Sequence, residues 1–92
     1  MIRTFGDKET KAVFGREPVK RFASIQGAAQ RRLDHIHAAT SLRDLGAIPG
    51  NRLEALKGDL KGFHSIRIND HWRVIFRWAD QATEDVAIRD YH

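Results

Sequence analysis

The chain has 92 residues, 41% hydrophobic and 30% charged, which fits one small soluble domain over residues 1–92 rather than a disordered or membrane-spanning chain. It contains no cysteine, so disulfides, thiolate nucleophiles and cysteine-based metal sites are excluded. Sixteen Lys and Arg against twelve Asp and Glu give a net charge of +4, which favours polyanionic partners such as nucleic acid. Because the first residues lack the apolar core of a signal peptide, we expect a cytoplasmic protein with no membrane partner.

The start of the chain predicts a strand and a short helix. Residues 2–5 have the composition of a short strand. Asp7 is a good N-cap for a helix over residues 8–14, because its carboxylate accepts a hydrogen bond from a backbone N–H of the first turn. Gly15 ends that helix, and a loop containing Pro18 follows.

A longer helix is expected next, from a Ser24 cap to about Ala39. Apolar residues recur there at three- and four-residue spacing and form one stripe, made of Ile25, Ala29, Leu33 and Ile36. Thr40 or Ser41 then caps one more helical turn, and Pro49-Gly50 ends the helical half.

The second half of the chain changes to a period of two, which is typical of strands. Four strands are predicted, over residues 52–56, 63–69, 72–78 and 85–89. The last three are joined by short turns and are therefore antiparallel neighbours. The predicted fold is α+β, a small twisted antiparallel sheet packed against two N-terminal helices in the order β-α-α-β-β-β-β. The helices cover one face of the sheet, and the other face is left for binding.

Arginines gather on the predicted uncovered face. Arg67, Arg73 and Arg77 alternate with the Ile, Trp and Phe residues that point to the core. A fixed row of guanidinium groups binds phosphates well, because each group donates two parallel hydrogen bonds. The alternative is a solvated face of an antiparallel sheet, on which arginine is common.

Two further groups carry acid–base chemistry. Asp90, Tyr91 and His92 directly follow the last strand, and they bring an acid, a phenol and an imidazole together. Glu54 and Lys57 lie near the end of the first of the four strands, where Lys57 can neutralise a phosphate and Glu54 can take a proton. The alternatives are a frayed terminus and an edge strand protected by charges.

Four blocks in this order resemble the HigB branch of the RelE/ParE toxin superfamily. They are Leu53–Asp59 with Gly62, Ser65–Asn69, Trp72–Phe76, and the final Asp90-Tyr91-His92. The resemblance runs over the whole chain and is densest from Pro49 onward. It implies the RelE-like fold and the toxin of a type II toxin–antitoxin pair.

The resemblance also implies an activity, that of a ribosome-dependent endoribonuclease. Relatives enter the ribosomal A site and cut messenger RNA without a metal or other cofactor, by attack of a ribose 2′-OH on the adjacent phosphate. The implied partners are the ribosome, mRNA and a HigA-like helix-turn-helix antitoxin, with operator DNA bound only through the antitoxin complex. The implied catalytic residues are His92, Asp90, Tyr91, Lys57, Arg73 and Glu54, and the implied RNA-binding residues are Arg67, Arg77 and Lys61.

One position departs from the family pattern, since some relatives have a histidine where this chain has Glu54. Glu54 acts as a base or is a spectator, and the sequence leaves both roles open. Two other functions also stay open. The ParE side of the superfamily inhibits DNA gyrase without cutting RNA, and a basic domain can bind RNA without cleaving it.

Overall fold

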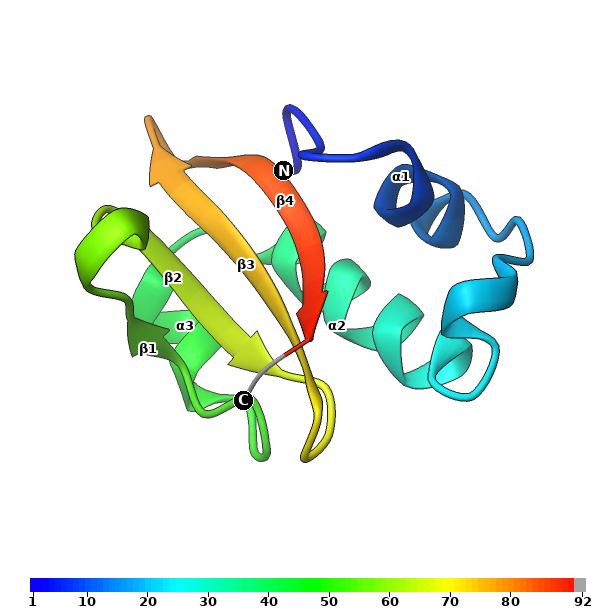
Figure 1. Ribbon diagram of the computed structural model, residues 1–92. Coiled ribbons are helices and arrows are strands. Elements are labelled where there is room, and N and C mark those ends of the chain that lie inside the picture. Colours follow the sequence, from blue (N-terminus) through cyan, green and yellow to red (C-terminus); the bar gives the residue numbers. More distant parts are fainter. Residues whose placement is uncertain (91–92) are drawn as a thin grey trace.

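The computed structural model describes residues 1–90 and shows helices packed against a four-stranded antiparallel sheet (Figure 1). The described helices are α1 (Lys8–Phe14), α2 (Gln26–Ala38) and α3 (Leu42–Ala47), with short 3₁₀ helices η1 (Lys20–Phe22) and η2 (Gly58–Leu60). The strands are β1 (Glu54–Ala55), β2 (Phe63–Arg67), β3 (Trp72–Ala79) and β4 (Ala82–Asp90), side by side in that order. The predicted α+β class is confirmed. Along residues 1–90, every helix is too short or too polar to span a bilayer.

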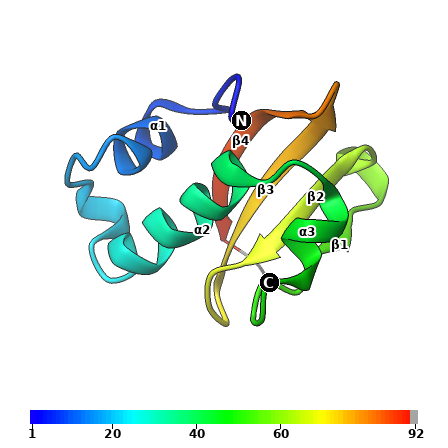
Figure 2. The ribbon, with the colours of Figure 1, turned by 180° about the vertical axis from the view of Figure 1, so that it is seen from behind.

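The helices lie on one face of the sheet. Seen from behind, α2 and α3 lie across the strands, and α1 packs beside β4 (Figure 2). The core between these layers is formed by apolar side chains from every layer, among them Val13, Ala29, Leu33, Ile36, Leu45, Ile66, Val74, Phe76, Val86 and Ile88. We call the opposite side of the sheet, which carries Ser65, Arg67, Arg73, Ile75, Ala87 and Arg89, the outer face.

A buried threonine ties α1 to the end of β4. As predicted, Asp7 caps α1, and its carboxylate accepts a hydrogen bond from the Thr10 backbone N–H at 2.6 Å. Thr10 is fully buried, and its hydroxyl oxygen accepts a hydrogen bond from the Ile88 backbone N–H at 3.0 Å. This contact joins residues 78 positions apart in the chain, and it fixes the segment that leads to the C-terminal residues.

A β-bulge interrupts the pairing of β3 with β4. Ile75 pairs with Ala87, but Arg77 pairs with Glu84, so one residue of β3 faces two residues of β4. Asp85 lies in the bulge with a φ of 54°, a conformation that aspartate tolerates better than most residues. The extra residue reverses the alternation that follows it. Val86 and Ile88 therefore point to the core and Arg89 lies on the outer face.

The predicted strand at residues 2–5 is wrong as a continuous element. The segment meets β4 only through two isolated parallel bridges, Ile2 with Thr83 and Phe5 with Val86. The bulge is the physical reason, because it separates the two bridges and turns the Asp85 N–H toward the Thr4 hydroxyl, which accepts its hydrogen bond at 2.9 Å.

Other boundaries also differ from the prediction: β2 ends at Arg67 rather than at residue 69, and β4 begins at Ala82 rather than at residue 85. Ser24 does not cap α2. Ile25 holds the N-cap position and makes no side-chain cap, because the preceding η1 leads the chain into α2 through backbone hydrogen bonds. The strand predicted over residues 52–56 is only Glu54–Ala55, since Arg52 has a φ of 46°, outside the extended region. Ser41 does cap the short third helix, as one of the two predicted alternatives.

Two threonines offer a matched test of the contact between α1 and β4. We expect Thr10→Val to lower the free energy of unfolding by about 1–3 kcal/mol, because it leaves the buried Ile88 N–H without an acceptor. Thr4→Val also removes an acceptor of a β4 N–H, that of Asp85, but at an exposed position where water replaces it. Denaturant unfolding measures both variants, and an equal loss in the two would contradict the role of burial.

Candidate active site

The centre of the outer face is a buried arginine. Only 9% of the Arg73 side chain is exposed, although it lies on the face that the helices leave uncovered. Its Nη1 donates a hydrogen bond to the Ser65 hydroxyl oxygen at 2.7 Å, and its Nη2 donates to Glu54 Oε1 at 3.2 Å. Because Glu54 pairs directly with Ser65 across β1 and β2, the sheet register brings both acceptors to the same guanidinium group.

A pocket of about 210 Å³ lies beside this cluster. Its lining combines apolar side chains with a few polar ones and consists of Leu56, Leu60, Ser65, Arg73, Ile75, Arg89 and Asp90. A cationic group at the edge of an apolar hollow suits a ligand with a phosphate at one end and a flat apolar group, such as a nucleobase, at the other.

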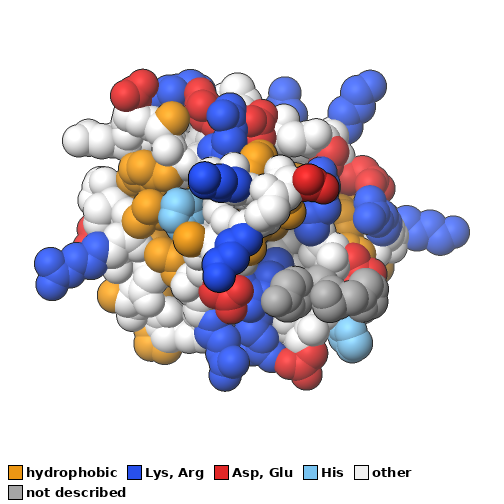
Figure 3. Space-filling view, turned by 60° about the vertical axis from the view of Figure 1, so that its left-hand side comes forward, with side chains coloured by type: hydrophobic (Ala, Val, Ile, Leu, Met, Phe, Trp, Pro, Cys, Tyr) orange, Lys and Arg blue, Asp and Glu red, His pale blue; other side chains and the backbone are white. Residues whose placement is uncertain are grey.

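Two lysines flank the turn that forms one wall of the pocket. Lys57 and Lys61 hold the two cap positions of η2, and both are exposed, while Leu60 between them lines the pocket. On the face that comes forward in Figure 3, Lys and Arg side chains gather in the centre and along the lower edge. Both lysines therefore adjoin pocket-lining residues in the chain, but neither lines the pocket itself.

Arg67 lies next to the buried arginine. It pairs directly with Arg73 across β2 and β3, and it forms an ion pair with the exposed Asp70. Its backbone oxygen accepts a hydrogen bond from Nε of Arg32 on α2 at 2.7 Å. Burial, together with the positive charges of Arg31 and Arg67, lowers the pKa of Arg32. This end of the sheet is therefore a region of concentrated positive charge.

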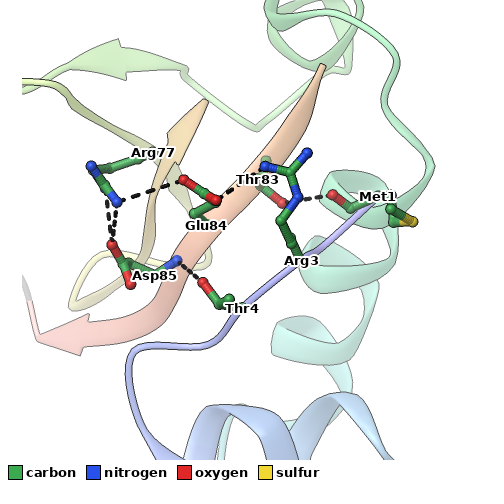
Figure 4. Close-up of polar contacts among 7 residues, drawn as sticks. All are labelled: Met1, Arg3, Thr4, Arg77, Thr83, Glu84 and Asp85. Carbon is green, nitrogen blue, oxygen red and sulfur yellow. Dashed lines mark hydrogen bonds and ion pairs between the residues drawn. The ribbon is translucent and has the colours of Figure 1, made fainter. Parts of the chain in front are cut away.

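Arg77 lies at the other end of β3, away from the pocket. Its guanidinium forms ion pairs with Asp85 at 2.9 Å and with Glu84 at 3.6 Å (Figure 4). Glu84 in turn pairs with Arg3 at 3.1 Å. Arg77 therefore belongs to a network that holds the N-terminal segment against the bulge.

Of the two interpretations of the arginine face, the alternative of a fully solvated face is wrong at its central position. Arg77 is exposed and Arg67 is partly exposed, but Arg73 is buried within the polar cluster. Asp90 is exposed at the end of β4 and lines the pocket. Tyr91 and His92 lie outside the described residues.

Sequence reasoning missed two polar residues of the site, Ser65 in the cluster and Arg89 in the pocket lining. Ser65 was placed on the arginine face by its alternation with Ile66, but nothing in the sequence marked its hydroxyl as an arginine acceptor. Arg89 lines the pocket because the bulge turns it to the outer face, and its only signal was its position just before the final tripeptide. Within residues 1–90, no three His, Asp or Glu side chains come together in a way that could hold a metal ion.

Comparisons with known proteins give a consistent result. The family model for HigB-like toxin, described as the RelE-like toxin of type II toxin–antitoxin system HigB, matches residues 3–92. Toxin HigB-1 of Vibrio cholerae serotype O1 is 48% identical over 58 residues, which are 63% of this chain and 61% of that protein. An uncharacterized protein of Haemophilus influenzae is 32% identical over 56 residues, 61% of this chain and 55% of that protein. The aligned part is thus less than two thirds of either relative.

Solved structures share the fold at low identity. Two structures of the YoeB–YefM toxin–antitoxin complex from Staphylococcus aureus contain a chain that superposes with TM-scores of 0.63 and 0.58. Each comparison covers 100% of this chain and 98% of the other, at 18% identity. The overall architecture is therefore that of the toxin fold.

The hydrogen bond between Ser65 and Arg73 is open to a direct stability test. We expect Ser65→Ala to lower the free energy of unfolding by about 1.5–3 kcal/mol, because it removes a buried acceptor from a charged donor. Ser24→Ala changes the same atoms at an exposed position and is the control, for which a change within about 0.5 kcal/mol is expected. Thermal and denaturant unfolding measure both, and a Ser65 variant as stable as the control would remove this bond from the site.

Proposed function

This chain belongs to the HigB-like family of RelE-like toxins, and we propose that it is an endoribonuclease that cuts mRNA in the ribosomal A site. The observation that carries the proposal is the Glu54–Arg73–Ser65 cluster at the edge of the pocket. It combines a cation that is held in place with a carboxylate that reaches the same guanidinium. A plain RNA-binding surface has no need of such a buried and oriented cation.

The proposed reaction is attack of the ribose 2′-OH on the adjacent phosphorus. The new bond joins the 2′-oxygen to phosphorus, the bond from phosphorus to the 5′-oxygen breaks, and a 2′,3′-cyclic phosphate results. One group takes the proton from the 2′-OH, and another gives a proton to the leaving 5′-oxygen. Arg73 and Lys57 neutralise the charge that grows on the phosphate oxygens, a task for which preorganised donors are effective.

The proton-transfer groups are proposed on both sides of the pocket. Glu54 reaches Arg73 from the β1 side, and Asp90 lines the pocket at the end of β4. Tyr91 and His92 follow Asp90 directly, and we propose that the tyrosine ring stacks on a base and that His92 acts as acid or base. The pH dependence of the cleavage rate distinguishes which side of the pocket supplies the base and which supplies the acid.

The proposed partners follow from the family and from the charge. Ribosome-bound mRNA is the substrate, and a cytoplasmic location brings the protein to it. Arg67, Lys61 and, more distantly, Arg77 are proposed to bind the RNA backbone by charge, which suits the net charge of +4. A HigA-like antitoxin is the proposed protein partner, since the structurally similar chains are toxins solved in complex with an antitoxin, and operator DNA is bound through that complex.

A comparison of the two arginines of β3, Arg73 and Arg77, distinguishes a catalytic cation from a surface charge. We expect Arg73→Ala to slow cleavage of ribosome-bound mRNA by about 10²–10³-fold, the cost of losing one oriented donor to a developing charge. Arg77→Ala removes an exposed side chain whose ion pairs lie away from the pocket, so we expect little change. Single-turnover cleavage measures both.

Because Arg73 is buried, Arg73→Lys is included as a variant that keeps the charge, with thermal unfolding to check its fold. Equal rates for the two alanine variants in folded protein would show that the site is misplaced.

The chemistry of the attack is tested with modified messages. We expect an mRNA with a 2′-deoxy or 2′-O-methyl sugar at the cut position to bind the programmed ribosome complex and resist cleavage, because the nucleophile is absent. We also expect cleavage of the unmodified message to survive chelation of divalent ions when polyamines keep the ribosome intact. Efficient cutting of the 2′-deoxy message would overturn the 2′-OH mechanism. Intact message together with inhibited DNA gyrase would favour the ParE-like alternative.

A further inference from the structure

Three arginines form one straight row across the outer face. Arg67 pairs directly with Arg73 across β2 and β3, and Arg73 pairs directly with Arg89 across β3 and β4. Neighbouring strands lie about 4.8 Å apart, so the three side chains start from adjacent positions on one side of the sheet. Like charges directly opposite one another destabilise a sheet, and an anion laid along the row would relieve that cost.

The bulge is what completes the row. Without the extra residue at Asp85, continuation of the pairing from Glu84 and Arg77 would set Ile88 opposite Arg73. Arg89 would then be opposite Trp72, on the core side. With the bulge, Ile88 joins the core and Arg89 enters the row beside the buried arginine. A strained backbone position thus serves to turn a cation toward the pocket.

Arg89 is also held in an orientation suited to a ligand. Its Nη1 donates to Asp7 Oδ2 at 3.2 Å and to the Ile88 backbone oxygen at 3.3 Å. Both of its hydrogen bonds within residues 1–90 use Nη1, which leaves the N–H groups of Nε and Nη2 for a ligand. The side chain is 50% exposed and lines the pocket together with Arg73.

We propose that Arg89 binds an RNA phosphate next to the one held by Arg73, so that the row Arg67–Arg73–Arg89 binds the backbone of single-stranded RNA across the strands. The inference rests on the proposed function and adds a positioning residue to it. Arg89 positions the RNA backbone next to the bond that is cut. Asp7, which also caps α1, fixes the direction of the Arg89 guanidinium group.

The test is RNA binding at several salt concentrations, with a short single-stranded 2′-O-methyl RNA that cannot be cleaved. We expect Arg89→Gln to bind more weakly and to reduce the slope of log K against log[salt] by about 0.7, the value for one phosphate contact on a single strand. Arg89→Lys keeps the charge and is expected to keep the slope. Thermal unfolding verifies that each variant is folded.

Arg16 provides a closely matched control. It forms one ion pair, with Asp34, donates to one backbone oxygen, that of Phe14, and has a side chain 52% exposed, but it lies outside the row. We expect Arg16→Gln to leave the slope unchanged. Equal slopes for the two glutamine variants, or no binding by the unchanged protein even at low salt, would overturn the role of Arg89. Absence of mRNA cleavage with an intact difference in slope would instead overturn the endoribonuclease proposal and leave the RNA site standing.

Discussion

Burial of the Arg73 charge is the constraint on which the site depends. A buried guanidinium is stable only when hydrogen-bond acceptors surround it, and here they come from two other strands. The two-residue strand β1 matters for this reason, since its pairing with β2 brings Glu54 to the arginine. The ordered charge then faces a pocket with an apolar wall, and in the proposed function this arrangement, although costly for stability, serves to hold a phosphate.

Much of the fold follows from local patterns in the sequence. The apolar stripe of α2, the Asp7 cap and the alternation in β3 each predict what the structure shows, because those elements satisfy their own hydrogen bonds and bury one face. The failures occur where tertiary contacts decide. Residues 2–5 do not form a continuous strand because the bulge in β4 takes the Asp85 N–H out of the ladder, and no local pattern marks that bulge.

The candidate site was only partly predictable. The sequence placed Arg73, Glu54 and Asp90 in it through their motif blocks, and the structure brings Glu54 to Arg73 and Asp90 to the same pocket. The burial of Arg73 and the contribution of Ser65 depend on the pairing of three strands, which alternation within a single strand does not determine. Arg77 was also not predictable from its strand alone. It lies on the same face of β3 as Arg73, but its guanidinium forms ion pairs with acidic residues at the far end of the strand.

The bulge at Asp85 also affects how this chain is compared with its relatives. Simple alternation along β4 assigns opposite faces to the same residue when it is counted from the hairpin and when it is counted from the C-terminal tripeptide, because the bulge adds one residue between them. An ungapped alignment with a relative that lacks the extra residue would exchange core positions for site positions along the end of the strand. Insertion or loss of this single residue would therefore change which side chains of β4 line the pocket, without a substitution at any other position of the strand.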